Sequence, residues 1–359
     1  MNVLSIIMLV FAALGALDRI FGNKLGLGKE FERGFNLLGT MALSMIGMIV
    51  LSPVIADLVS PALNFIYNTF GIDPSVLPAS IFANDMGGAP MSVAVGKDAG
   101  IALFNALVVS SMMGCTVSFN IPYAVSAVDK KHHKELFLGM LCGIATIPIG
   151  CFVGGLFSKI PFTALLINLL PLIIFAAIIV LGLIFIPKIC VKIFAVFGHL
   201  MKALITVGLV LGMINLISGK EIIKGLSSIE DAALICLNAA VFLAGAFPFM
   251  FLVSKPLKKP INALGNKAGI NSASAFGFIS TLVTNVTTYE KMKDMDDRGI
   301  VLNSAFAVSA AFVFGGHLGF TIAFDGSLTF PVIIGKLTAG ISALALALLI
   351  SKKITAEKP

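Results

Sequence analysis

The chain has 359 residues, of which 58% are hydrophobic and only 12% are charged, and its formal net charge at pH 7 is +7. Its mean hydropathy is +1.03. A soluble domain carries roughly twice this charged fraction, so the composition excludes an ordinary soluble protein and predicts an all-α polytopic membrane protein.

Nine segments are long and apolar enough to cross a bilayer as helices, which takes about 20 residues each. In chain order they cover residues 2–18, 36–56, 101–127, 136–157, 164–186, 194–217, 231–253, 300–324 and 330–351. The loops between them are short, which leaves no room for a separate soluble domain.

The basic residues are distributed unevenly among the segments that join these spans. With the N-terminus placed outside, most of the 25 lysines and arginines fall in cytoplasmic segments. The exceptions are Lys97, Lys159, Lys220 and Lys224, which lie outside, and Lys202 and Lys336, which lie within spans. The positive-inside rule therefore places the N-terminus outside and the C-terminus in the cytoplasm. This topology also accounts for the positive charge, so we expect no nucleic-acid partner.

Motifs for metals, nucleotides and cofactors are absent from the sequence. There is no Walker loop, dinucleotide fingerprint or HExxH motif. The five cysteines lie in or at the ends of apolar spans without metal-ligand spacing, and we interpret them as packing residues. We therefore predict no metal site, no cofactor and no transport powered directly by ATP within this chain.

The two halves of the chain resemble each other. The stretch "DAGIALFNALVVSS" from Asp98 matches "DRGIVLNSAFAVSA" from Asp297 at a constant offset. Pro53 and Pro61 in the first half have the spacing of Pro248 and Pro256 in the second, and "GID" at 71–73 corresponds to "GIN" at 269–271. The shared order of these matches predicts an internal duplication.

The predicted topology makes this duplication inverted. The span that begins near residue 101 runs inwards, whereas its partner near residue 300 runs outwards. We predict a first repeat over 1–160, a linking helix over 161–190 and a second, inverted repeat over 191–359. Inverted repeats are typical of secondary transporters, whose sites lie near the midplane of the membrane.

A semi-polar stretch follows the second span of each repeat, at residues 74–97 and 270–290. The charge distribution places both flanks of each stretch on one side of the membrane, which predicts two re-entrant hairpins. The alternative is that residues 61–72 and 256–268 form further crossings. Bent backbone at membrane depth is tolerated where protein or water satisfies its polar groups.

The first hairpin tip contains the sequence "NDMGG", in which Asp85 lies within a long apolar region. Gly87 and Gly88 would give this tip its flexibility. The second tip contains "TNVTT", with Thr284 and Asn285. An ionised Asp85 would be costly unless paired, and the facing spans show no obvious basic partner. Asp85 is therefore protonated, binds an ion or meets a cationic substrate; the structural alternative is that it caps a short helix.

Five further residues are candidates for the substrate pathway. Ser110 and Ser309 are equivalent by repeat, although serines in membrane helices also bond their own backbone. Asn120 and Tyr123 flank a proline, and the tyrosine ring offers a cation–π face. His317 in "GGHLG" could donate to a substrate or serve only in packing.

Several motifs together resemble the bacterial ethanolamine-utilisation permeases, the EutH family. They are "LGALDRIFGNKLGLGKEFERGF", "ANDMGG", "SSMMGCTVSFNIP", "TIPIGC" and "MDDRGIVLNSAFAVSAAFVFGGHLGF", which run in this order over nearly the whole chain. The resemblance implies a protein of the bacterial inner membrane that passes ethanolamine to cobalamin-dependent breakdown in the cytoplasm. It also implies no enzymatic activity in the chain itself.

The candidate residues fit this substrate. Ethanolamine at neutral pH is a small cation with one hydroxyl group. We hypothesise that Asp85 pairs with the ammonium, that Asn285 or Thr284 meets the hydroxyl with Asn84 nearby, and that the two hairpins alternate as gates.

Three other functions remain open on the sequence. The chain could be an ion-coupled carrier for another small amine or an amino acid, a passive channel, or a scaffold or sensor subunit. Besides the substrate, the expected partner is membrane lipid; the sequence leaves open whether the protein forms a homo-oligomer.

Overall fold

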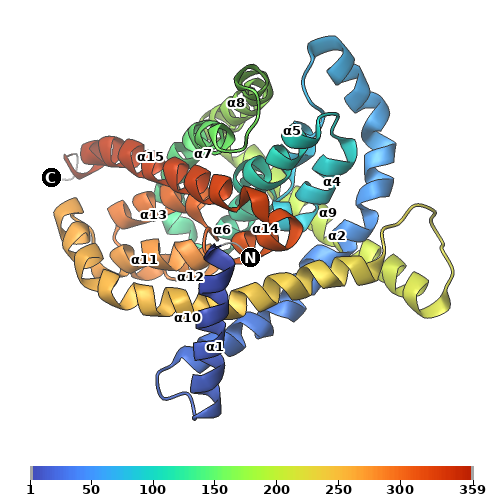
Figure 1. Ribbon diagram of the computed structural model, residues 1–359. Helices are drawn as coiled ribbons and strands as arrows, with labels where there is room; N and C mark the ends of the chain where they lie inside the picture. Colours follow the sequence, from blue (N-terminus) through green and yellow to red (C-terminus); the bar gives the residue numbers. More distant parts are fainter. Residues whose placement is uncertain (1–2, 357–359) are drawn as a thin grey trace.

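The computed structural model describes residues 3–356, and this part of the chain is helical without strands (Figure 1). The α-helices are α1 Val3–Ile20, α2 Leu27–Phe70, α3 Val76–Ile81, α4 Gly88–Val95, α5 Ala99–Phe104, α6 Ile121–Ala127, α7 His133–Leu156, α8 Phe162–Phe185, α9 Pro187–Ser218, α10 Ile229–Ala268, α11 Ser272–Val283, α12 Asn285–Glu290, α13 Asp297–Ala310, α14 Gly316–Asp325 and α15 Thr329–Ala356. Two π-helical stretches, η2 Asn105–Gly114 and η3 Thr116–Asn120, and the 3-10 turns η1 Asn84–Met86, η4 Lys130–His132, η5 Met292–Asp294 and η6 Gly326–Leu328 complete the chain.

Within residues 3–356, seven stretches are long and apolar enough to span a membrane. They are Leu27–Phe70, Ala99–Ala127, Lys130–Leu156, Phe162–Phe185, Pro187–Ser218, Ile229–Pro256 and Gly316–Ser351. A polytopic membrane protein is thereby supported, but the predicted number of nine spans is not confirmed. The region predicted at 300–324 is broken after α13, and α14 joins α15 in a single candidate span.

The order of elements is the same in both halves of the chain. Each half has a long helix with internal prolines, α2 or α10, which ends at a left-handed glycine, Gly71 or Gly269. Two short helices follow, then an interrupted helix and a long helix, α7 or α15. Residues 61–70 and 256–268 continue α2 and α10 rather than forming separate crossings. That the repeats are inverted, and the boundaries assigned to them, stay predictions.

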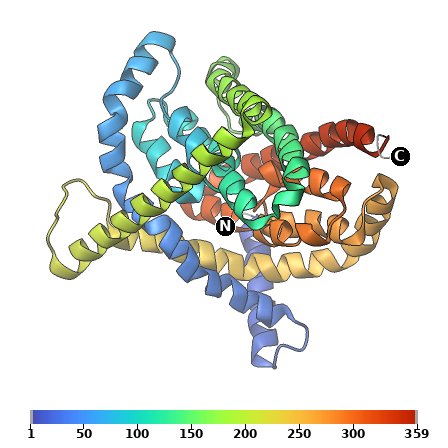
Figure 2. The same ribbon diagram turned by 180° about the vertical axis from the view of Figure 1, so that it is seen from behind.

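The long helices α2 and α10 pack against each other along the base of the molecule (Figure 1). Their contact is close because Gly34 lies against the backbone of Ala244, where a Cβ would collide. Figure 2 shows α9 crossing the outside of the molecule. Large apolar side chains on α8 and α9 are exposed, for example Phe185 at 75% and Ile217 at 79%. Such faces are suited to contact with lipid tails rather than water.

Helices α7 and α15 cross at small residues. A Cβ on Gly150 would collide with the carbonyl oxygen of Gly335, and one on Gly154 would lie 2.9 Å from the carbonyl oxygen of Pro331. Small residues let membrane helices approach at backbone distance. This crossing fixes the position of Lys336, the residue that follows Gly335.

Residues 74–97 and 270–290 each consist of two short helices with a break between them, and we call them the first and second interrupted segments. The two ends of each segment meet. Asp73 accepts hydrogen bonds from the backbone N–H groups of Lys97 and Asp98, each at 3.0 Å. At the second segment, Asn271 donates its backbone N–H to Asp296 at 2.9 Å and its side-chain amide to the Asp294 carbonyl at 3.0 Å. Each segment therefore begins and ends at one place.

Replacing Asp73 by alanine is expected to lower stability by about 2–4 kcal/mol, because backbone N–H groups that a carboxylate satisfies would lose their partner. Asp73 is 4% exposed and also accepts from the backbone and hydroxyl of Ser75, at 3.0 and 2.5 Å. Thermal unfolding in detergent would measure the loss. An unchanged melting temperature would show that Asp73 does not hold the segment closed.

The central helix of each half is irregular. In the first half, residues 105–120 are almost entirely π-helical. In the second half, α13 ends at Ala310 and α14 begins at Gly316, with Phe312 in the left-handed region at φ 62°. The unwound residues bond to α11, through Phe312 N–H to Thr281 at 3.1 Å and Phe314 N–H to Leu282 at 2.8 Å. Such irregular backbone often marks a functional region in membrane proteins.

Candidate functional site

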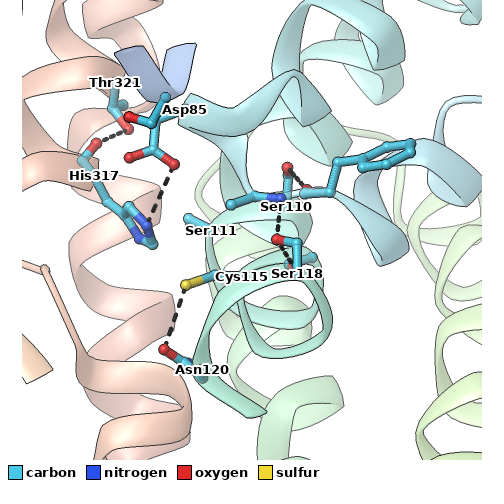
Figure 3. Close-up of polar contacts among 12 residues, drawn as sticks. Asp85, Ser110, Ser111, Cys115, Ser118, Asn120, His317 and Thr321 are labelled. Atoms are coloured by element: carbon cyan, nitrogen blue, oxygen red, sulfur yellow. Dashed lines mark hydrogen bonds and ion pairs between the residues drawn. The ribbon is translucent and has the colours of Figure 1, made fainter. Parts of the chain in front are cut away.

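The break in the first interrupted segment is held by the π-helix that packs on it. Ser110 donates its hydroxyl to the carbonyl of Phe82 at 2.5 Å, and the hydroxyl of Ser118 accepts the backbone N–H of Ala83 at 3.0 Å (Figure 3). The Ala83 carbonyl then accepts from Met86 and Gly88. These bonds turn the chain so that Asp85 faces α14. Ser110, predicted to line the pathway, therefore fixes the break.

Glycine is required at the two predicted positions of this break for different structural reasons. Gly87 has φ 95°, which favours glycine because side chains with a Cβ rarely adopt it. Gly88 has a negative φ, but a Cβ there would collide with the Ser110 hydroxyl and the Phe82 carbonyl. Both glycines shape the turn, and their flexibility stays a prediction.

The carboxylate of Asp85 lies at the N-terminus of α14. One oxygen is 3.8 Å from Nε2 of His317, and the other lies 4.0 Å from where a Cβ on Gly316 would stand (Figure 3). The positive end of a helix favours a negative charge at this place. Although the surrounding helices are apolar, 26% of the Asp85 side chain is exposed. Asp85 is therefore partly exposed although it lies among apolar helices.

Lys336 on α15 is a member of this site that the sequence reasoning missed. It is 1% exposed, and its Nζ donates to the Ser111 carbonyl at 2.6 Å and lies 3.3 Å from Nδ1 of His317. The expectation that no basic partner faces Asp85 was wrong, because α14 places His317 3.8 Å from Asp85 and α15 places Lys336 3.3 Å from the same imidazole ring. The sequence signal was available, since Lys336 interrupts an otherwise apolar span.

Asn84 and Ser309 carry buried polar groups that no described residue satisfies. Both side chains are 0% exposed. Neither the oxygen nor the nitrogen of the Asn84 amide has a hydrogen-bond partner among the described residues, and the Ser309 hydroxyl has none either. Unsatisfied buried groups are rare in proteins and call for an explanation. A polar ligand would supply the missing partners.

A second polar cluster joins the halves of the chain. Asn285 donates its amide to Asn120 at 2.5 Å, and Asn120 donates to the Val308 carbonyl at 3.1 Å. The Cys115 thiol lies 3.7 Å from the Asn120 oxygen, between this cluster and Asp85 (Figure 3). The structure thus brings Asn120 and Asn285 together, but no described contact links either residue directly to Asp85.

Thr284 and Tyr123 lie beyond this second cluster. Thr284 caps α12 and lines a cavity of about 290 Å³, together with Glu30, Arg33, Phe247, Met250, Phe251, Ser254, Phe276, Ile279, Ser280, Val283, Thr287 and Lys291. Tyr123 stacks on Phe119 at 5.3 Å and donates its hydroxyl to Glu290 at 3.1 Å. The predicted residues therefore do not form one compact pocket, and of these residues Thr284 alone lines this cavity.

Comparison with known proteins identifies the chain. The family described as "Ethanolamine utilisation protein, EutH" matches residues 1–350. The chain belongs to the EutH family. The predicted resemblance is thereby confirmed.

Three relatives in this family illustrate the match. A protein of Listeria monocytogenes, named "Probable ethanolamine permease EutH", is 42% identical over 350 residues, which cover 97% of this chain and 93% of the relative. A protein of the same name from Salmonella typhimurium is 35% identical over 98% of this chain and 96% of its own length. The "Uncharacterized protein YxeR" of Bacillus subtilis is 36% identical over 95% and 92%. No solved structure matches the chain.

Proposed function

We propose that this protein is a permease of the bacterial inner membrane that moves protonated ethanolamine into the cytoplasm. The observation that carries the proposal is the partly exposed carboxylate of Asp85, which follows directly after Asn84 with its buried, unpartnered amide. Ethanolamine has an ammonium and a hydroxyl two carbons apart, and these two consecutive residues carry a group that could pair with each. The permease names of the relatives support the same substrate.

The path of the substrate follows the series of polar residues. Asp85 receives the ammonium, while Asn84 and Ser309 offer hydrogen bonds near it. Farther along, Asn120 and Asn285 pass the substrate to Thr284, Tyr123 and the adjoining cavity. His317 stands beside the first position and Ser110 holds its shape. In this proposal Thr284 and Asn285 meet the hydroxyl only after the substrate has left Asp85.

The two interrupted segments act as gates in this proposal. Their closed ends support the interpretation as re-entrant hairpins, because a chain that enters and leaves the membrane on one side must begin and end at one place. The repeats are inverted, with the N-terminus outside and the C-terminus in the cytoplasm. The cavity lined by Arg33 and Lys291 then opens towards the cytoplasm.

Uptake of labelled ethanolamine into proteoliposomes tests the proposed function. Acidic buffer on both sides suppresses leakage of the neutral amine, and protein-free vesicles measure what leakage remains. We expect saturable uptake that unlabelled ethanolamine inhibits and amino acids do not. Uptake that rises linearly with concentration would indicate a channel, and uptake no faster than in protein-free vesicles would overturn the proposal.

Replacing Asn84 by alanine is expected to raise the KM for ethanolamine about tenfold, the effect of one lost hydrogen bond of about 1.4 kcal/mol. Inhibition by ethylammonium provides the matched control, because this cation keeps the charge but lacks the hydroxyl. Its inhibition constant should change less than twofold. If both constants rise equally, Asn84 supports the fold of the break and does not read the hydroxyl.

A further inference from the structure

The proposed binding of a cation at Asp85 does not explain why a lysine, Lys336, is buried next to the same site. A lysine that is 1% exposed within an apolar helix needs compensating charge. Asp85 supplies this charge, with the imidazole of His317 between the two residues: Nζ of Lys336 is 3.3 Å from Nδ1, and Asp85 is 3.8 Å from Nε2. The empty site thus contains one positive and one negative group and is neutral as a whole.

The contacts of His317 define its tautomer in this empty site. An ammonium group only donates hydrogen bonds, so with Lys336 protonated Nδ1 of His317 is the acceptor and carries no proton. The proton of the neutral ring is then on Nε2 and points towards Asp85. Phe312, in the unwound stretch before α14, packs on the ring at 4.9 Å and holds its plane. The ring is therefore arranged as a bridge between the lysine and the carboxylate.

The other titratable groups around Lys336 are neutral at physiological pH. Cys115, next to the π-helices, and Cys151 on α7 lie within electrostatic reach of the lysine, and Cys236 on α10 lies within reach of Asp85. Tyr289 on α12 is near Cys115. Helix α13 carries no titratable side chain between Ile300 and Ala310. Thiols and phenols are protonated and uncharged at this pH. Asp85 is thus the carboxylate that balances Lys336.

A substrate cation would upset this balance. When an ammonium binds Asp85 while Lys336 stays protonated, two positive groups share one carboxylate in a buried site. Leaving a buried charge without a partner is strongly unfavourable. The site remains neutral only if Lys336 loses its proton when the substrate arrives.

We propose that the arriving substrate displaces one proton from Lys336 through His317, so that the permease exchanges one ethanolammonium for one proton. This inference rests on the proposed function. An N–H bond of Lys336 breaks as an N–H bond forms at Nδ1, and Nε2 releases its proton to water beside Asp85. The ring ends neutral, with Nδ1–H donating to the uncharged amine. Nε2 becomes an acceptor that faces the substrate.

This exchange makes transport electroneutral. The loaded site holds the substrate cation and Asp85, and the empty site holds protonated Lys336 and Asp85. Each form of the site is neutral, so neither moves net charge when the site changes from facing one side of the membrane to facing the other. The membrane potential then has no influence on the distribution of ethanolamine. Simple uniport of the cation would instead accumulate substrate about 50-fold for each 100 mV.

The test is uptake by native protein in proteoliposomes at equal acidic pH, with and without a potassium diffusion potential of about 100 mV, inside negative. We expect the initial rate and final level to change less than twofold. Potential-driven accumulation would overturn the exchange while leaving the permease proposal intact. Absence of saturable uptake would instead overturn the permease proposal.

Lys336→Met separates the step in which the empty site returns across the membrane from the step in which the loaded site carries the substrate. The variant cannot neutralise the empty site, so net uptake should fall at least tenfold. Counterflow of labelled against preloaded unlabelled ethanolamine should persist, because in counterflow the site holds a substrate in both directions and the empty site does not have to return. Lys202→Met is the matched control, since Lys202 lies exposed on α9, and both activities should stay unchanged. Native net uptake by Lys336→Met would overturn the inference; if the variant does not fold, the potential experiment on native protein decides.

Discussion

Asp85→Asn is expected to reduce saturable ethanolamine uptake at least about 100-fold. The change keeps the size of the side chain but removes the negative charge that would pair with the ammonium. Removing one partner of a buried charge pair costs about 3–5 kcal/mol, which corresponds to a factor of 100 or more. It also leaves Lys336 without its counter-charge, because the lysine reaches Asp85 through His317. Transport assays in proteoliposomes at acidic pH would measure the loss.

Asp57→Asn is the matched control for this variant. Asp57 is an exposed residue of α2, so its replacement should leave uptake within twofold of the native rate. Both variants must elute as monodisperse species from size exclusion to be compared. If Asp85→Asn is folded and transports as well as the native protein, Asp85 serves only to shape the break. The search for the cation site would then move to Tyr123, Asn120 and His317.

Much of the arrangement of helices could be predicted from the sequence. The paired prolines of α2 and α10, and the glycines that end them, mark equivalent positions in both halves because these residues have strict backbone requirements. A break in the helix near Asp85 and near Asn285 was also expected, since polar residues interrupt the apolar pattern there. Hydropathy alone did not give the division into spans, because an unwound stretch of five residues breaks the helix near Phe312 without changing its composition.

The composition of the site was less accessible to sequence reasoning. Asp85, Asn84, Asn120 and His317 could be selected because each is polar in an apolar stretch. Lys336 has the same property but lies 251 positions after Asp85, and its proximity depends on how α15 crosses α7 at Gly150 and Gly335. Likewise, both interrupted segments were expected to meet at one pocket, whereas Cys115 and Asn120 lie between Asp85 and Asn285. Such three-dimensional proximity has no local signal in the sequence.

Gly88→Ala is expected to destabilise the protein by about 1–3 kcal/mol and to reduce uptake at least tenfold. The new methyl group would collide with the Ser110 hydroxyl and the Phe82 carbonyl, and would lie 2.7 Å from the Ala83 carbonyl. The backbone has little freedom to move aside, because Ser110 holds the Phe82 carbonyl and Ser118 holds the Ala83 N–H. Overpacking at a rigid site costs this amount of free energy, and the shift would displace Asp85 from α14.

Gly39→Ala provides the comparison that separates this collision from a general effect of alanine. Gly39 lies in α2 with open space where a Cβ would stand, so the substitution should leave uptake unchanged. It should stabilise the helix by up to about 1 kcal/mol, since alanine has the higher helix propensity. Thermal unfolding in detergent and uptake in proteoliposomes would be measured for both variants. If Gly88→Ala matches Gly39→Ala in both assays, the break tolerates a side chain and the close approach of the π-helix does not position Asp85.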